Sequence, residues 1–230
     1  MIRLSKRLRI IHDMVPVSVV ADIGSDHGKL MIALVQSGKV KKGFAVENKE
    51  GPFERLRSNL IRYHVDDKIT PLFSDGVKDI TRDVGTIVIA GMGGQTIVNI
   101  LKAHPEKLVS LQTIIIDAHT SVPLVRKEIS QMGFAIADER IVKEDGIFYE
   151  IIKFIRADIA ALTNEDLEFG PVLRHQKSAT FKEKYQSRID EIDNIIAEGN
   201  LPEQRITALN EEKHKLRDIY EHEETSFKTF

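Results

Sequence analysis

The stretch that decides the fold is VSVVADIGSDHG, residues 17–28. Its first part, residues 17–23, is mostly apolar and β-branched, which predicts a strand buried on both faces. The glycine-rich segment 24–28 follows at once, and residues 29–37 then have the pattern of a helix closed by Gly38. A strand that passes through a glycine-rich turn into a helix predicts the first unit of a Rossmann-like α/β fold.

Short apolar runs alternate with helical segments through residue 155. Further strands are predicted at residues 43–46, 69–73, 86–90 and 113–117, and further helices at 52–64, 95–103 and 122–132. Apolar strands separated by helices predict right-handed βαβ units, and hence a mostly parallel sheet.

The last two predicted strands, 134–142 and 148–155, have no helix between them. An Asp-Gly pair at 145–146 marks a tight turn. Parallel strands cannot be joined by so short a connection, so we expect an antiparallel hairpin. A mostly parallel sheet with one antiparallel strand near its C-terminal edge is typical of class I methyltransferases that use S-adenosylmethionine.

The composition changes after Ile155, where strand signals disappear and Glu, Lys and Arg dominate. Isoleucines at 189, 192 and 196 fall at helical spacing, Gly199-Asn200 breaks the pattern, and a second apolar stripe follows Pro202. We therefore predict two domains. Residues 1–157 form the Rossmann-like catalytic domain, and residues 158–230 form a helical hairpin that resembles a short coiled coil.

The glycine-rich loop differs from a dinucleotide-binding loop, because Asp26 stands where a pyrophosphate would lie against a glycine. A carboxylate would repel a pyrophosphate, whereas Asp22 and Asp26 suit a cationic ligand. S-adenosylmethionine carries an ammonium and a sulfonium group, so it is the expected cofactor. The loop residues predicted to contact it are Asp22, Gly24, Ser25, Asp26 and His27, with His27 in the first turn of the following helix.

Acidic and glycine residues also follow the next three predicted strands. A glutamate ends the second strand, where a carboxylate can accept hydrogen bonds from ribose hydroxyls. An Asp-Gly pair follows the third, as a contact for the adenine amino group or as an ordinary turn. Gly-Met-Gly-Gly follows the fourth, and ligands bind outside the carboxyl ends of such strands. The cofactor contacts predicted here are Glu47, Asp75, Gly76, Gly91, Met92 and Gly93.

Six segments of the chain together resemble one family. They are Leu-Ser-Lys-Arg-Leu at 4–8, Asp-Ile-Gly-Ser-Asp-His at 22–27, Glu47 with Gly-Pro at 51–52, Ser-Asp-Gly at 74–76, Ile-Ala-Gly-Met-Gly-Gly at 89–94 and Gly-Ile-Phe-Tyr-Glu-Ile-Ile at 146–152. With them the chain resembles the TrmK-type tRNA (adenine-N1)-methyltransferases of Gram-positive bacteria, which also carry a C-terminal coiled coil. The resemblance implies methylation of adenosine 22 of tRNA at N1.

The loop after the fifth predicted strand departs from this family. Residues 117–120 read Asp-Ala-His-Thr, where the family usually has a Gln-Pro-Asn-like element. Because this loop borders the expected acceptor pocket, the departure bears on the substrate more than on the fold or the cofactor.

Asp26 is the candidate catalytic residue. Methyl transfer shifts positive charge onto the adenine ring, which a facing carboxylate would stabilise. The alternative is that Asp26 only caps the helix or holds the cofactor. An N-terminal helical segment carries basic residues that either contact tRNA phosphates or form a solvated face. These candidate RNA-binding residues are Arg3, Lys6, Arg7 and Arg9.

Composition narrows the classes of function. The 230 residues carry a formal net charge of −2, so RNA contact requires a local basic patch. The absence of cysteine excludes thiolate metal sites, disulfides and a cysteine nucleophile. No apolar run reaches the roughly 18 residues of a membrane-spanning helix. We expect a cytoplasmic enzyme without metal or membrane attachment. The alternatives are a small-molecule methyltransferase and a non-catalytic nucleotide-binding module whose coiled coil binds a partner.

Overall fold

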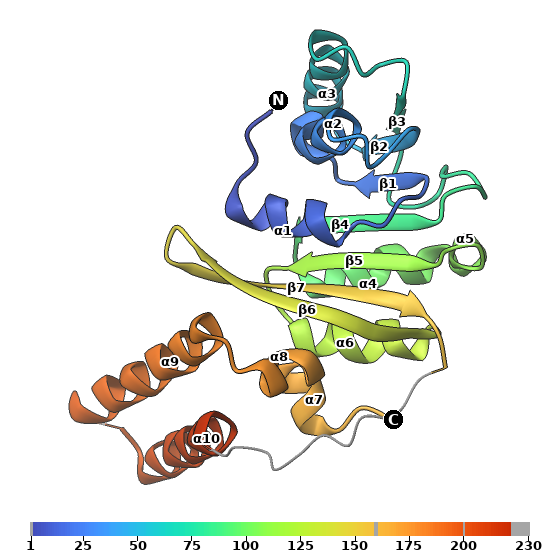
Figure 1. The fold of residues 1–230 in the computed structure, drawn as a ribbon. Coiled ribbons are helices and arrows are strands. Elements are labelled where there is room, and N and C mark those ends of the chain that lie inside the picture. Colours follow the sequence, from blue (N-terminus) through green and yellow to red (C-terminus); the bar gives the residue numbers. More distant parts are fainter. Residues whose placement is uncertain (1, 159–160, 200, 222–230) are drawn as a thin grey trace.

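The structure is a computed structural model that describes residues 2–158, 161–199 and 201–221. Its centre is a seven-stranded sheet in the order β3-β2-β1-β4-β5-β7-β6 (Figure 1). Strand β7 is antiparallel to both of its neighbours, and the other pairings are parallel. The strands are β1 Val20–Ile23, β2 Gly43–Glu47, β3 Ile69–Phe73, β4 Thr86–Met92, β5 Thr113–Ala118, β6 Phe134–Glu144 and β7 Ile147–Arg156. The predicted Rossmann-like sheet and its antiparallel hairpin are thus confirmed.

Helices cover both faces of the sheet, because successive residues of a buried strand point to opposite sides. In β4, Val88 packs in the core beneath α1 (Lys6–Met14), α2 (Lys29–Gln36) and α3 (Glu50–Arg62). Its neighbours Ile87 and Ile89 pack in the opposite core, with α4 (Gly94–Ala103) and α6 (Val122–Gln131). The short helix α5 (Pro105–Leu108) follows α4. Two separate apolar cores therefore hold the sheet rigidly between helices.

Two strand boundaries differ from the predicted ones. Strand β1 begins at Val20 rather than at residue 17, since Val17 is 82% exposed and lies before the sheet pairing starts. Strand β4 continues to Met92, past the predicted end at residue 90, by way of an irregularity between Ala90 and Met92. Apolar pattern alone does not mark where the hydrogen-bond ladder begins or where a bulge extends it.

The C-terminal part is helical, as predicted. Helices α9 (Ala179–Ala197) and α10 (Glu203–Glu221) form the predicted hairpin, which extends away from the sheet (Figure 1). Two short helices that the sequence did not predict, α7 (Asn164–Phe169) and α8 (Pro171–Gln176), precede it. The apolar residues of this region form a third core: Phe169, Leu173, Phe181, Tyr185, Ile189, Ile192, Leu209 and Leu216. The domain boundary between residues 157 and 158 stays a prediction.

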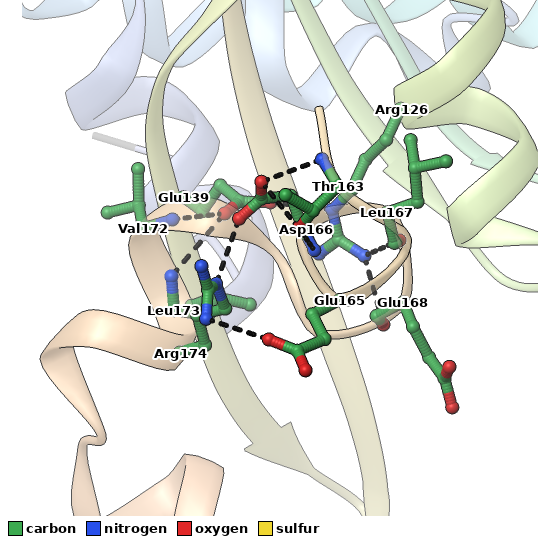
Figure 2. Close-up of polar contacts among 10 residues, drawn as sticks. All are labelled: Arg126, Glu139, Thr163, Glu165, Asp166, Leu167, Glu168, Val172, Leu173 and Arg174. Atoms are coloured by element: carbon green, nitrogen blue, oxygen red, sulfur yellow. Dashed lines mark hydrogen bonds and ion pairs between the residues drawn. The ribbon is translucent and has the colours of Figure 1, made fainter. Parts of the chain in front are cut away.

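A buried arginine joins α6 and the sheet to α7 (Figure 2). The Arg126 side chain is fully buried; its Nε donates to Glu139 Oε1 at 2.8 Å, and its Nη1 donates to the carbonyl of Leu167 at 3.0 Å. Its Nη2 pairs with Glu150, which also pairs with Lys184 of α9. Burial by itself would raise the pKa of Glu150, but the charges of Arg126 and Lys184 lower it below its ordinary value. Two cations therefore balance two buried carboxylates at this junction.

Candidate active site

A cleft of about 590 Å³ opens at the carboxyl ends of β1 to β4. Five residues predicted to contact the cofactor line it: Gly24, Glu47, Asp75, Gly76 and Met92. The carboxyl ends of parallel strands are where ligands bind in this class of sheet. The structure therefore brings together, in one cavity, residues at or just after the ends of four strands.

The glycine-rich loop is folded tightly against the sheet. Gly24 has φ +74°, a left-handed conformation that favours glycine. The N–H groups of Gly24 and Ser25 both donate to the carbonyl of Val46 at 2.9 Å, which ties this loop to β2. A Cβ on Gly24 would lie 2.2 Å from Cε of Met92, so the methionine side chain packs directly on the glycine. The left-handed backbone therefore favours glycine at position 24, and a larger residue would also displace the end of the Met92 side chain.

Asp22 and Ser25 lie beneath the cleft rather than along its wall. Both are buried, and Ser25 Oγ donates to Asp22 Oδ2 at 2.6 Å. Burial raises the pKa of Asp22 to about 6, even though the Ser25 hydrogen bond opposes the shift, and nearby Asp26 adds to it. A cationic ligand would favour the charged form of this carboxyl, so the site fits a ligand with a positive group.

One carboxylate oxygen of Glu47 accepts hydrogen bonds within the protein, and the other can accept them from a ligand. Its Oε1 accepts the backbone N–H groups of Asn48 and Lys49, both at 3.0 Å. Its Oε2 accepts no hydrogen bond from the residues that the structure describes. Because Glu47 lines the cleft, this oxygen can accept the ribose hydroxyls of a nucleoside. The donor and acceptor set of the cleft therefore fits S-adenosylmethionine.

Further polar residues of the cleft were not predicted from the sequence: Asn48, Lys49, Thr96, Asn99 and His104. Thr96 and Asn99 lie one turn apart on α4, a spacing that places both on one face of a helix. This spacing of two polar residues was the feature of the sequence that could have indicated a polar face of α4 toward the cleft. Asn48 also donates to Asp75 Oδ1 at 3.1 Å, which links the loops after β2 and β3.

Asp26 and His27 do not line this cleft. The Asp26 side chain is 74% exposed and lies 3.4 Å from His27 Nε2. The prediction that His27 lies in the first turn of the helix was wrong, because a separate 3₁₀ turn, Asp26–Gly28, precedes α2. His27 there has φ +58°. The carboxylate of Asp26 is therefore accessible to a substrate outside the cofactor cleft, and its catalytic role stays a prediction.

The end of β4 separates two environments. Met92 lines the cofactor cleft, and Gly91 faces the other way. A Cβ on Gly91 would lie 3.9 Å from Arg7 Nη1 and 4.0 Å from His119 Nε2. Gly93 is the N-cap of α4 and does not line the cleft. One side of this segment therefore faces the cleft, and the other faces Arg7 and His119.

The basic residues of the N-terminus separate into two groups. A groove of about 720 Å³ lies between the start of the chain with α1 and the end of strand β6, at Val142 and Glu144. It is lined by Arg3, Lys6 and Arg9. Arg7 instead forms an ion pair with the buried Asp117, with 2.7 Å between Nη1 and Oδ2. The structure thus brings three of the four predicted RNA contacts to one groove, and Arg7 lies elsewhere.

Comparison with known proteins agrees with this site. Residues 20–221 match the family described as tRNA (adenine(22)-N(1))-methyltransferase. The chain belongs to this family. The Bacillus subtilis (strain 168) tRNA (adenine(22)-N(1))-methyltransferase is 28% identical over 96% of this chain and 98% of its own length.

Two solved structures of relatives contain the cofactor or its product. A Streptococcus pneumoniae protein in complex with S-adenosyl-L-methionine superimposes with a TM-score of 0.86, at 28% identity, over 95% of this chain and 100% of its own. TrmK of M. capricolum in complex with S-adenosyl-homocysteine superimposes with a TM-score of 0.81, at 26% identity, over 94% of this chain and 97% of its own. The fold of this TrmK-family chain is therefore that of proteins that hold this cofactor.

Proposed function

We propose that this chain transfers the methyl group of S-adenosylmethionine to N1 of adenosine 22 in tRNA. The observation that carries the proposal is the family match over residues 20–221, which spans both the cofactor cleft and the helical hairpin. S-adenosylmethionine supplies an activated methyl group, so the protein has mainly to bind and orient the two reactants.

The cofactor is held by the residues of the cleft and of the loop beneath it. Glu47 Oε2 accepts the ribose hydroxyls, and Asp75 provides an acceptor for the adenine amino group. The buried carboxylate of Asp22, beneath the cleft, attracts the cationic group of the cofactor. Gly24 and Gly76 line the cleft in left-handed conformations, with φ +74° and +58°, and without side chains they let the ligand approach the backbone. Ser25, Gly91 and Gly93 act by shaping the loops rather than by lining the cavity.

Asp26 is the proposed catalytic residue. Adenine N1 lies on the Watson–Crick edge, so the base must be unpaired or flipped out before it can react. Positive charge then develops on the ring, and an accessible carboxylate beside it stabilises that charge. The exposure of Asp26 outside the cofactor cleft supports this role, and its neighbour His27 lies within ion-pair distance. An Asp26→Ala variant should bind cofactor normally and methylate at least 10-fold more slowly.

The groove lined by Arg3, Lys6 and Arg9 is the proposed contact for tRNA phosphates. Phosphate contacts release counterions, so replacing these three residues by alanine should weaken tRNA binding and flatten its dependence on salt. In the part of the chain that the structure describes, no helix has both the length and the apolar character needed to cross a bilayer. With tRNA as substrate, the expected compartment is the cytoplasm.

The deciding experiment is methyl transfer from labelled S-adenosylmethionine to unmodified bacterial tRNA, followed by nucleoside analysis. We expect 1-methyladenosine, which disappears when adenosine 22 is replaced by guanosine. If 1-methyladenosine persists in the replaced tRNA, the position is wrong. If cofactor binds and no tRNA is methylated, a small-molecule acceptor or a non-catalytic role replaces the proposal.

A further inference from the structure

Four side chains meet on the side of Gly91 that faces away from the cofactor cleft, and none of them lines that cleft. They form the Arg7 cluster: Arg7 of α1, Asp117 of β5, His119 just after β5, and Tyr149 of β7. Arg7 contacts each of the other three. Its Cζ lies 4.8 Å from the Tyr149 ring centroid, and its Nη1 lies 3.0 Å from His119 Nε2.

The contact with Arg7 sets the tautomer of His119. An arginine side chain can only donate hydrogen bonds, so His119 Nε2 must be the acceptor. The imidazole is therefore neutral, and its proton lies on Nδ1. His119 is exposed, and its Nδ1 has no hydrogen-bond partner among the described residues. The cluster thus presents one neutral, unpaired N–H donor to the outside.

The charge of the cluster is balanced. Asp117 is fully buried, and its carboxylate cancels the charge of Arg7. Burial raises the pKa of Asp117, while the charge of Arg7 and its hydrogen bond oppose that shift. An uncompensated arginine next to a base that is becoming cationic would oppose the reaction. The ion pair of Arg7 with Asp117 has no net charge, and the N–H group of a neutral His119 carries none, so neither opposes the reaction.

This ion pair is poorly explained as a stabilising feature. Arg7 Nε and Asp117 Oδ1 are buried and have no hydrogen-bond partner among the described residues. An ion pair that leaves polar atoms unsatisfied costs more in desolvation than one that is fully bonded. The pair does, however, fix the position and the tautomer of His119, which is a property that substrate binding can use.

The cluster adjoins the cofactor site through a single loop. The His119 N–H donates to the carbonyl of Met92 at 2.9 Å, and the Gly94 N–H donates to the carbonyl of Thr120 at the same distance. These bonds hold the loop after β5 against the loop after β4. A Cβ on Gly91 would meet nothing closer than 3.9 Å, so the backbone beside Arg7 and His119 is not covered by a side chain of its own, while Met92 lines the cofactor cleft.

We propose that the Arg7 cluster is the acceptor-base subsite, in which an unpaired purine lies beside Gly91 and accepts a hydrogen bond from His119 Nδ1–H. Arg7 and Asp117 are positioning residues, and Tyr149 forms the wall behind them, with its ring centroid 5.6 Å from that of His119. This inference rests on the proposed methylation of tRNA and adds the residues that receive the base.

The test compares three replacements of the exposed His119. His119→Asn places its amide N–H near the position of Nδ1, His119→Gln places it near Nε2, and His119→Ala has no donor. We expect His119→Ala and His119→Gln to lower kcat/KM for tRNA by about 10-fold to 100-fold, and His119→Asn to stay within several-fold of wild type. Affinities for S-adenosylmethionine and for tRNA should change by no more than about twofold, since phosphate contacts dominate tRNA binding. His214→Ala, an exposed histidine on α10, is the matched control.

A second measurement follows the tautomer itself. Long-range ¹H–¹⁵N NMR of the wild-type enzyme should show His119 with its proton on Nδ1, and Arg7→Met should shift this pattern toward the other tautomer while kcat/KM falls. Full activity of His119→Ala, parallel loss of cofactor affinity, or an Nε2–H tautomer in the wild type would each overturn the subsite. A wild-type enzyme that binds cofactor yet methylates no tRNA would overturn the proposed function first, while the tautomer result stands by itself.

Discussion

Replacing Arg126 with methionine should destabilise the protein by about 3–5 kcal/mol. The arginine is the shared partner of Glu139 and Glu150, and all three side chains are buried. Removing one partner of a buried ion pair leaves an uncompensated charge, and losses of about this size follow. In Arg126→Met the carboxylates of Glu139 and Glu150 would remain buried, and of the two cations described at this junction Lys184 alone would be left to pair with them.

The measurement is urea and thermal unfolding of wild type, Arg126→Met and Arg188→Met. For a chain of this length, roughly 2–4 °C is lost per kcal/mol, so Arg126→Met should melt about 6–20 °C lower. Arg188 makes the same kind of ion pairs, with Glu191 and Glu212, but on the surface of the hairpin. Exposed pairs contribute about 0.2–1 kcal/mol each, so loss of both should lower the melting temperature of Arg188→Met by no more than about 8 °C.

The pH dependence tests the physical cause. Burial already raises the pKa of Glu139 despite its pairing with Arg126, and without Arg126 that pKa should rise further. A carboxyl whose pKa is higher in the folded than in the unfolded state destabilises the fold increasingly as pH rises. The gap between Arg126→Met and wild type should therefore be smaller at pH 5 than at pH 7. A loss no larger than that of Arg188→Met, or a gap that does not narrow in acid, would refute the reasoning.

Three further predictions concern the cofactor site. Glu47→Gln should weaken S-adenosylmethionine binding by about 10-fold to 100-fold in calorimetry, because a hydrogen bond to a charged group contributes about 1.5–3 kcal/mol; Glu54→Gln, on the exposed side of α3, should bind as wild type. Gly24→Ala should also weaken cofactor binding, since alanine strains a backbone with φ +74° and its Cβ, 2.2 Å from Met92 Cε, would displace that cleft-lining side chain; binding as tight as wild type would contradict this. Asp22 has its pKa raised by burial to about 6, so its contribution to stability falls as pH rises from about 4 to 6. Asp22→Asn should remove this component, roughly 3 kcal/mol for a shift of about two pKa units; unfolding curves whose pH dependence matches wild type would show that the carboxyl is not desolvated.

The helical hairpin illustrates what local sequence can carry. Ile189 and Ile192 are buried as their helical spacing predicts, and α9 ends at Ala197, close to the break predicted at Gly199, while residue 200 lies outside the described residues. The strands of the sheet were found for the same reason, since a strand buried on both faces must be apolar throughout. The glycine-rich loops were found because left-handed backbone and close approach require glycine at particular positions, as at Gly24.

Only the tertiary structure decided which polar side chains face which site. Arg7 and Arg9 are two residues apart in α1, yet Arg7 is directed to the buried Asp117 and Arg9 to an open groove. Likewise, Arg126 gives no local signal that it is buried, because its two carboxylate partners lie on the following strands and its carbonyl partners on α7. A repeating apolar pattern is written along the chain, so the sequence by itself determined the fold and the cofactor loops. The balance of buried charges, and with it the acceptor side of the site, depends on contacts between residues far apart in the chain, which form only when the chain folds.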